Sequence, residues 1–306
     1  MNPLRGILLK VTSVTIFVAM ASLIKASAAQ GVPPGEAVFF RSLFAIPVIV
    51  VWLTLQGHLH DGLKTTHAMS HVWRGLVGTC AMGLGFAGLG LLPLPEVTAI
   101  GYAAPLLVVV LAAMFLGEQV RIYRLSAVAL GLVGVLIVLS PRMTVLETTD
   151  VRQTLGAVLV LGSAMFAALA QVFVRKLVQI ETTAAIVFYF SVSATVLSML
   201  TIPYGWIMPS VSVLAMLVAA GLLGGVGQIF LTSAYRFADV SVIAPFEYAS
   251  MLLALASGYF IFNEVPTLTM LGGAMLVILA GVLIIWREHQ LGLEREKQRR
   301  AMTPGG

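Results

Sequence analysis

The chain has 306 residues, of which 59% are hydrophobic and 10% charged, and its mean hydropathy is +1.00. A soluble globular protein is typically about 45–50% apolar and about 25% charged, so this composition excludes a water-soluble enzyme. Cys80 is the only cysteine, which excludes a disulfide scaffold. The net charge of +5 comes from basic residues between and after the apolar runs rather than on one face, so we expect no nucleic-acid partner.

Polar and Pro- or Gly-rich breaks divide the chain into apolar segments of roughly 20 residues, the length of one helical crossing of a bilayer. The segments are continuously apolar and lack the alternation of a barrel strand, so they are helices. The sequence therefore predicts an all-α integral membrane protein surrounded by the lipid bilayer. The ten expected spans are about 7–28, 37–55, 72–91, 97–117, 123–140, 154–174, 182–202, 211–234, 240–262 and 267–286.

The basic residues indicate the orientation of these spans, because cytoplasmic connections are enriched in Lys and Arg. With a cytoplasmic N-terminus, all 18 Lys and Arg residues lie on the inner side except Lys25, Arg41, Arg142 and Arg152. An even number of spans then places the C-terminus on the same side. We therefore expect both termini in the cytoplasm.

A cleavable signal peptide is an alternative interpretation of the N-terminus. Arg5, the apolar stretch after it and the small residues Ala26-Ser27-Ala28 imitate the regions of such a peptide. Lys10 and Lys25 interrupt the part that should be uncharged, and cleavage would leave an odd number of spans. The retained first span is the interpretation that we follow.

Two stretches of the chain repeat each other. Tyr102–Glu118 aligns with Tyr248–Glu264 at a constant offset, and Gly134–Ile137 aligns with Gly281–Ile284 one residue later in register. A weaker match pairs Phe39, Phe40 and Ser42 with Phe188, Tyr189 and Ser191. The polar and glycine matches carry the inference, since apolar coincidences are expected by chance.

The repeat divides the chain into residues 1–145 and 146–288, each with five spans, and a basic tail, 289–306. An odd number of spans forces the second half to cross the membrane in the opposite sense to the first. The expected fold is therefore two inverted five-helix repeats, an architecture typical of secondary transporters. It predicts alternating access of a small molecule to a site near the middle of the membrane.

Three motifs occupy characteristic positions in these spans. They are Phe39-Phe40-Arg41 in the second, Pro105 followed by Phe115-Leu116-Gly117-Glu118 in the fourth, and Ala244-Pro245-Phe246-Glu247-Tyr248 with Phe262-Asn263-Glu264 in the ninth. Together with the two five-span halves, they resemble EamA-type members of the drug/metabolite transporter superfamily over residues 4–286. The resemblance implies a transporter of the bacterial inner membrane.

Within that family, Pro33–Ser42 and Leu92–Ala99 are most similar to the bacterial riboflavin importers. This resemblance implies riboflavin uptake. An exporter of amino acids or amphipathic metabolites is the alternative, because the same fold supports it. The sequence leaves open the direction of transport, coupling to protons or ions, and whether the chain forms a homodimer.

Glu247 is the most informative charged residue, because a charge inside a span is costly and marks a functional site by default. It follows Pro245, which lacks a backbone N–H and favours a kink, and it precedes Tyr248. We expect Glu247 to bind the substrate or to carry a coupling proton. The alternative is a packing role, in which it accepts free backbone donors or pairs with a basic side chain.

Lys25 and Arg41 lie toward the outer ends of the first two spans, against the charge bias, with Glu36 between them in sequence. One interpretation is that they reach the outer interface or pair with Glu36. The other is that they line an outer vestibule that attracts a polar or anionic group. We include both residues in the candidate substrate site.

Aromatic and amide side chains are expected to complete the cavity, since a ring-shaped substrate needs stacking faces and hydrogen-bonding groups at its edge. Each of them could instead pack in the interior or face lipid. The candidates are Tyr102, Phe86, Gln171, Tyr189, Gln228, Tyr235 and Tyr248.

The histidines His58, His60, His67 and His71 surround the second connection. We expect a solvated loop rather than a metal site, because no ligand spacing on one helix face supports metal and no cysteine joins them. No phosphate-binding loop or nucleophile motif is present, and the acidic residues are scattered. The sequence therefore predicts no cofactor, no ATP coupling and no catalytic residues of a membrane enzyme.

Overall fold

The computed structural model describes residues 3–57, 62–116, 122–143, 151–237 and 244–302. Within these ranges all regular elements are helices, which confirms the predicted all-α fold. The helices of the first half are α1 (Pro3–Ala28), α2 (Pro34–Leu43), α3 (Ala45–Leu55), α5 (Ala68–Leu89), α6 (Leu94–Gly101), α7 (Ala103–Leu116) and α8 (Ile122–Met143). Those of the second half are α9 (Val151–Ile180), α10 (Thr183–Met199), η1 (Ile202–Tyr204), α11 (Val211–Phe237), η2 (Ala244–Tyr248), α13 (Ala249–Phe262) and α14 (Leu268–Met302).

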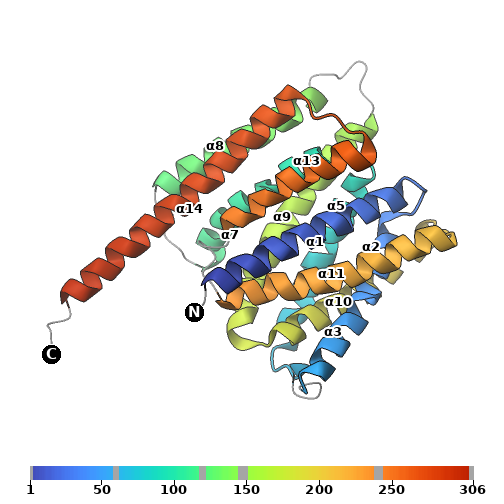
Figure 1. Ribbon diagram of the computed structural model, residues 1–306, viewed down its shortest axis with the longest axis horizontal. Coiled ribbons are helices and arrows are strands. Elements are labelled where there is room, and N and C mark those ends of the chain that lie inside the picture. Colours follow the sequence, from blue (N-terminus) through green and yellow to red (C-terminus); the bar gives the residue numbers. More distant parts are fainter. Residues whose placement is uncertain (1–2, 58–61, 117–121, 144–150, 238–243, 303–306) are drawn as a thin grey trace.

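The described parts of the predicted spans fall on these helices, and residues 117 and 240–243 of the prediction lie outside the described ranges. Among the described residues, five helical segments are long and apolar enough to cross a membrane, and five shorter apolar helices account for the other spans. The start of α1 and the end of α14 lie toward the same side of the bundle (Figure 1). We call this the terminal end, and the opposite end, which holds residues 29–33, 90–93, 200–210 and 263–267, the distal end.

Two spans are interrupted at corresponding positions of the repeat. In the first half, α6 ends and α7 begins at Tyr102, and Pro105 explains this break because it has no N–H to donate to the preceding turn. In the second half, the 3₁₀ segment η2 gives way to α13 at Tyr248, after Pro245. Broken helices at matching positions of two repeats are typical of transporter binding sites.

The most extensive helix contacts join one half of the chain to the other. In Figure 1, α1 runs along α11 and α8 runs along α14, and α5 packs on α9 in the same way. Because α1 and α9 open the two halves and α5 and α11 are their third spans, the α1–α11 and α5–α9 contacts are equivalent to each other. The two inverted five-helix repeats therefore interlock rather than lie side by side.

The outer surface of the bundle is apolar. Large side chains such as Leu55, Leu252 and Phe260 are 82%, 72% and 80% exposed, which suits contact with lipid tails. The last span has no visible end at residue 286, because α14 continues as a helix to Met302, through most of the expected basic tail.

The α8–α14 contact depends on two glycines that face each other. A Cβ on Gly273 would lie 2.7 Å from the Gly134 carbonyl oxygen and 2.7 Å from Val138 Cγ2, closer than atoms can approach. A Cβ on the adjacent Gly272 would meet nothing within 4 Å. The two neighbouring positions therefore form a matched pair for testing the helix contact.

We expect Gly273→Ala to lower the free energy of unfolding by about 1–3 kcal/mol, because the backbones of α8 and α14 must separate. Gly272→Ala should be neutral or stabilising by up to about 1 kcal/mol, since alanine favours the helix. Thermal unfolding of the detergent-solubilised protein would measure both. Equal effects of the two substitutions would contradict the close helix contact.

Candidate functional site

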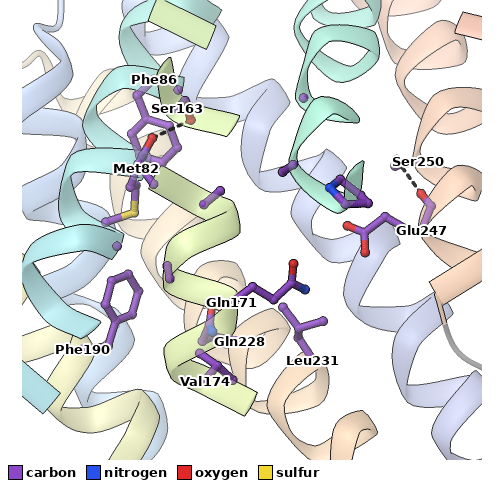
Figure 2. A pocket seen from close by; sticks show the side chains of 18 of the residues that line it. Met82, Phe86, Ser163, Gln171, Val174, Phe190, Gln228, Leu231, Glu247 and Ser250 are labelled. Atoms are coloured by element: carbon purple, nitrogen blue, oxygen red, sulfur yellow. Dashed lines mark hydrogen bonds between the residues drawn. The ribbon is translucent and has the colours of Figure 1, made fainter. Parts of the chain in front are cut away.

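A cavity of about 480 Å³ lies between the two halves, within the size range of small-molecule sites (Figure 2). Its walls come from α2, α5, α6 and α7 of the first half and from α9, α10, α11, η2 and α13 of the second. It reaches from Leu89 and Val97 near the distal end to Val174 and Tyr235 near the terminal end. Both repeats thus contribute to one central cavity.

Arg41 of α2 and Arg74 of α5 form the basic wall of this cavity. They are only 2% and 6% exposed, and the Cζ atoms of both lie over the ring of Phe190, at 5.6 and 4.1 Å from its centroid. Space for the guanidinium groups is left by glycine. A Cβ on Gly224 would lie 2.7 Å from Arg41 Nε, and one on Gly78 would overlap Arg74 Nη1.

Neither arginine has an acidic partner within ion-pair distance among the described residues. Arg41 Nη2 donates to the Gly224 carbonyl at 3.3 Å, but Nε and Nη1 of both arginines have no hydrogen-bond acceptor. Buried charges are normally paired, because removing a charge from water is costly. The basic wall is therefore an exception in this structure.

Glu247 of η2 lies on the other side of the cavity from Phe190 and Met82 (Figure 2). Its Oε2 is 2.5 Å from Nζ of Lys10 on α1, and the side chains of Lys10 and Glu247 are 2% and 39% exposed. Glu247 therefore pairs with a basic side chain, as the alternative interpretation of this residue proposed. The accessible part of the carboxylate also faces the cavity, so pairing and substrate contact are compatible.

Amide and aromatic groups line the space between these two walls. Gln171 Nε2 donates to the Tyr235 hydroxyl at 2.6 Å and links α9 to α11. Gln228 and Phe86 also line the cavity and are 9% and 6% exposed. Figure 2 shows the Gln171 side chain extending toward the side of Glu247.

The two tyrosines at the broken helices touch each other. The ring centroids of Tyr102 and Tyr248 are 5.1 Å apart, and the Tyr102 hydroxyl lies 2.7 Å from Ser250 Oγ and donates to the Tyr248 carbonyl at 3.3 Å. Because these tyrosines are equivalent in the repeat, the pseudo-two-fold axis passes between them. The residue equivalent to Ser250 is Ala104, so this hydrogen bond has no symmetric counterpart.

Polar contacts close the distal end of the bundle. Lys25 Nζ is 2.9 Å from Glu264 Oε1 and donates to the Leu92 carbonyl at 2.6 Å, and Glu264 Oε2 accepts the N–H of Leu94 at 2.8 Å. These contacts tie α1, the start of α6 and the end of α13 together. Elsewhere at this end, the buried Glu36 accepts the N–H of Ile207 at 3.0 Å.

A second polar cluster surrounds Glu181 at the terminal end, between α9 and α10. Its Oε1 accepts hydrogen bonds from Thr65 Oγ1 at 2.7 Å and from the Thr66 N–H at 3.3 Å, and it lies 3.3 Å from His67 Nδ1. Arg236 donates to the Glu181 carbonyl. Burial raises the pKa of the Glu181 carboxyl, but these hydrogen bonds outweigh burial and hold the pKa below its ordinary value.

The expectation that all four histidines lie in a solvated loop is wrong for His71. His71 is 3% exposed and lies in α5 against the ring of Tyr189, so it is not part of a solvated loop. Hydrophobic packing between α5 and α10 explains its burial. The described residues contain no group of three or more potential metal ligands, and His58 and His60 lie outside them.

Seven of the ten candidate residues line the cavity: Arg41, Phe86, Tyr102, Gln171, Gln228, Tyr235 and Glu247. Lys25, Tyr189 and Tyr248 do not. Lys25 pairs with Glu264, so the alternative in which it pairs with Glu36 is wrong. Tyr189 donates to the Leu63 carbonyl at 2.9 Å, outside the cavity, and the Tyr248 hydroxyl fills the space beside Gly281.

Arg74, Lys10 and Phe190 were missed by sequence reasoning. Arg74 and Lys10 were counted as cytoplasmic charges, although each lies inside an expected span, and that position is the signal that could have found them. Phe190 carries no such signal, because an aromatic residue in an apolar span looks like ordinary packing.

The model of the EamA-like transporter family matches residues 4–140 and 154–286, which together form most of the chain. The chain is an EamA-like transporter. Both matched segments coincide with the two halves described above. This EamA-like protein therefore moves a small metabolite across a bacterial membrane and is not an enzyme.

Relatives of this EamA-like transporter have different cargoes. The S-adenosylmethionine uptake transporter of Rickettsia prowazekii (strain Madrid E) is 31% identical over 258 residues, 83% of this chain and 84% of that protein. The pseudopaline exporter CntI of Pseudomonas aeruginosa (strain UCBPP-PA14) is 30% identical over 89% of this chain and 93% of its own length. The riboflavin transporter of Vibrio cholerae serotype O1 is 26% identical over 96% of this chain and 97% of its own.

A solved crystal structure has the same fold. It superposes with a TM-score of 0.67 and 18% sequence identity, and the match covers 94% of this chain and 98% of the other.

We expect the Lys10–Glu247 pair to behave as one unit. Glu247→Gln alone should lower the free energy of unfolding by about 3–5 kcal/mol, because it leaves Lys10 buried without a counter-charge. Adding Lys10→Met should restore most of that loss. Thermal unfolding of the two single variants and the double variant would measure the coupling, and purely additive effects would contradict it.

The Glu181 cluster predicts an acid-sensitive contribution to stability. Because its pKa is lowered in the folded protein, the carboxylate stabilises the fold above the pKa of the unfolded chain, and this contribution is lost as the pH falls through the folded pKa. Glu181→Gln should therefore lower the unfolding midpoint at neutral pH and bring it closer to the unsubstituted protein in acid. Parallel pH curves for the two proteins would refute the assignment.

Proposed function

We propose that this EamA-like transporter takes up S-adenosylmethionine, or a closely similar amphipathic metabolite, across the bacterial inner membrane by alternating access. The observation that carries the proposal is the ligand-sized cavity between the inverted halves, which combines ring faces, amides and charged groups. Adenine suits ring faces and amide edges. The S-adenosylmethionine uptake transporter of Rickettsia prowazekii, which is 31% identical to this chain, supports this choice.

Riboflavin, which the sequence favoured, is the second candidate. The riboflavin transporter of Vibrio cholerae supports it, because the match extends over 96% of this chain. Stacking against Phe86 or Phe190 and hydrogen bonding to Gln171 or Gln228 would suit its ring system equally well. Riboflavin has no charged group, so its binding would leave Arg41 and Arg74 of the basic wall without a charged partner.

In the proposed transport cycle, the halves 1–145 and 146–288 exchange conformations and the basic tail 289–306 stays in the cytoplasm with both termini. The distal end is tied by Lys25 and Glu264, whose side chains are 14% and 16% exposed, whereas Glu247 toward the terminal end is 39% exposed. This difference supports an inward-facing arrangement. The substrate-binding roles of Glu247, Tyr102, Gln171, Gln228, Tyr235 and Arg41 are part of the same proposal.

Uptake by intact cells tests the proposal. Bacteria that cannot make S-adenosylmethionine and express this chain should accumulate the labelled compound, and a riboflavin-requiring strain tests the second candidate in parallel. Ala167→Trp should abolish uptake, because residue 167 lines the cavity.

Leu252→Trp is the matched control, since residue 252 is 72% exposed on the outer surface and should keep normal uptake. Uptake of riboflavin without S-adenosylmethionine would reverse the order of the candidates. Uptake of neither, with the protein present in the membrane, would refute the proposal and favour export.

A further inference from the structure

The basic wall of the cavity carries charge that nothing in the described protein neutralises. Arg41 and Arg74 are both more than nine-tenths buried, and their Nε and Nη1 atoms have no acceptor. Glu247, the acidic residue of the cavity lining, is already paired with Lys10. The lining therefore has two uncompensated positive charges, which a ligand can offset.

The space around these guanidinium groups is shaped for them. Gly78 and Gly224 stand where any larger residue would collide with Arg74 and Arg41, and Phe190 supports both cations from the ring face. The flat Phe190 ring and the two planar guanidinium groups suit an acceptor that receives parallel N–H hydrogen bonds. Carboxylates are bound by arginine in this way.

The arrangement is not required by the repeat. In the alignment that pairs Phe39, Phe40 and Ser42 with Phe188, Tyr189 and Ser191, the partner of Arg41 is Phe190. The second half thus builds the equivalent span without a buried cation. Packing alone therefore does not require a charge at this position. Because the charge lies beside a ligand-sized cavity, it indicates ligand binding.

We propose that Arg41 and Arg74 form a subsite for a carboxylate of the transported metabolite. The inference rests on the proposed function, because it assumes that cargo occupies this cavity, and it adds that the cargo is an amphipathic molecule with a free carboxylate. S-adenosylmethionine has a free carboxylate at its amino-acid end, and riboflavin has none.

Binding to the purified full-length protein in lipid nanodiscs tests the subsite without requiring transport. Isothermal titration would compare S-adenosylhomocysteine, which has a carboxylate, with 5′-methylthioadenosine, which keeps the adenosyl group but lacks the amino-acid part. Adenosine monophosphate and glycine test a phosphate and a small carboxylate. We expect S-adenosylhomocysteine to bind at least about tenfold more tightly than 5′-methylthioadenosine.

Arg74→Met should weaken S-adenosylhomocysteine binding by roughly 10- to 100-fold, the effect of losing a hydrogen bond to a charged group. It should leave the unfolding midpoint of the ligand-free protein unchanged or higher, because an unpaired buried charge is removed. Arg152→Gln, which removes an arginine from an exposed position at the start of α9, is the control and should bind normally.

Equal binding of the two adenosyl compounds, unaffected by Arg74→Met, would overturn the subsite even if cells take up S-adenosylmethionine. Tight binding of adenosine monophosphate alone would overturn the carboxylate in favour of a phosphate. A destabilised ligand-free Arg74→Met protein with normal binding would assign Arg74 to packing. Arg74-dependent binding of glycine or S-adenosylhomocysteine, without uptake of S-adenosylmethionine, would keep the subsite and refute only the proposed cargo.

Discussion

The cost of burying charge away from water governs how the side chains in and around the central cavity are arranged. Three sets of cations within the bundle meet this cost in two ways. Lys25 at the distal end and Lys10 toward the terminal end each have a carboxylate partner, Glu264 and Glu247. Arg41 and Arg74 in the middle have none among the described residues, and we propose that their partner is the cargo.

The inverted repeat explains why such a site can lie between two nearly equivalent halves. Tyr102 and Tyr248 are equivalent residues at broken helices, and they meet at the pseudo-two-fold axis. Their surroundings differ, since Ser250 bonds Tyr102 while its counterpart is Ala104. The two halves are therefore equivalent in their broken helices but differ in the hydrogen bonds at the axis.

The sequence predicted the fold more completely than it predicted the residues of the candidate site. Apolar segment lengths and the Tyr102–Glu118 and Tyr248–Glu264 match were enough to predict ten helical spans in two inverted halves. Candidate residues within spans were found where the residue type itself was unusual, as for Glu247 and Gln171. Arg74 was overlooked because a basic residue near the end of a span is also the normal signal of orientation.

Hydropathy and the repeat therefore determined, from sequence alone, that the chain is a membrane-embedded helical bundle of two repeats. These features follow from local composition and periodicity, because every spanning segment must satisfy its own backbone hydrogen bonds in lipid. Only the tertiary structure decided which charges are paired. Lys10 and Glu247 are 237 residues apart in the chain, and Lys25 pairs with Glu264 rather than with nearby Glu36. Helix packing brings such distant partners together, and no local sequence pattern predicts which residues will pair.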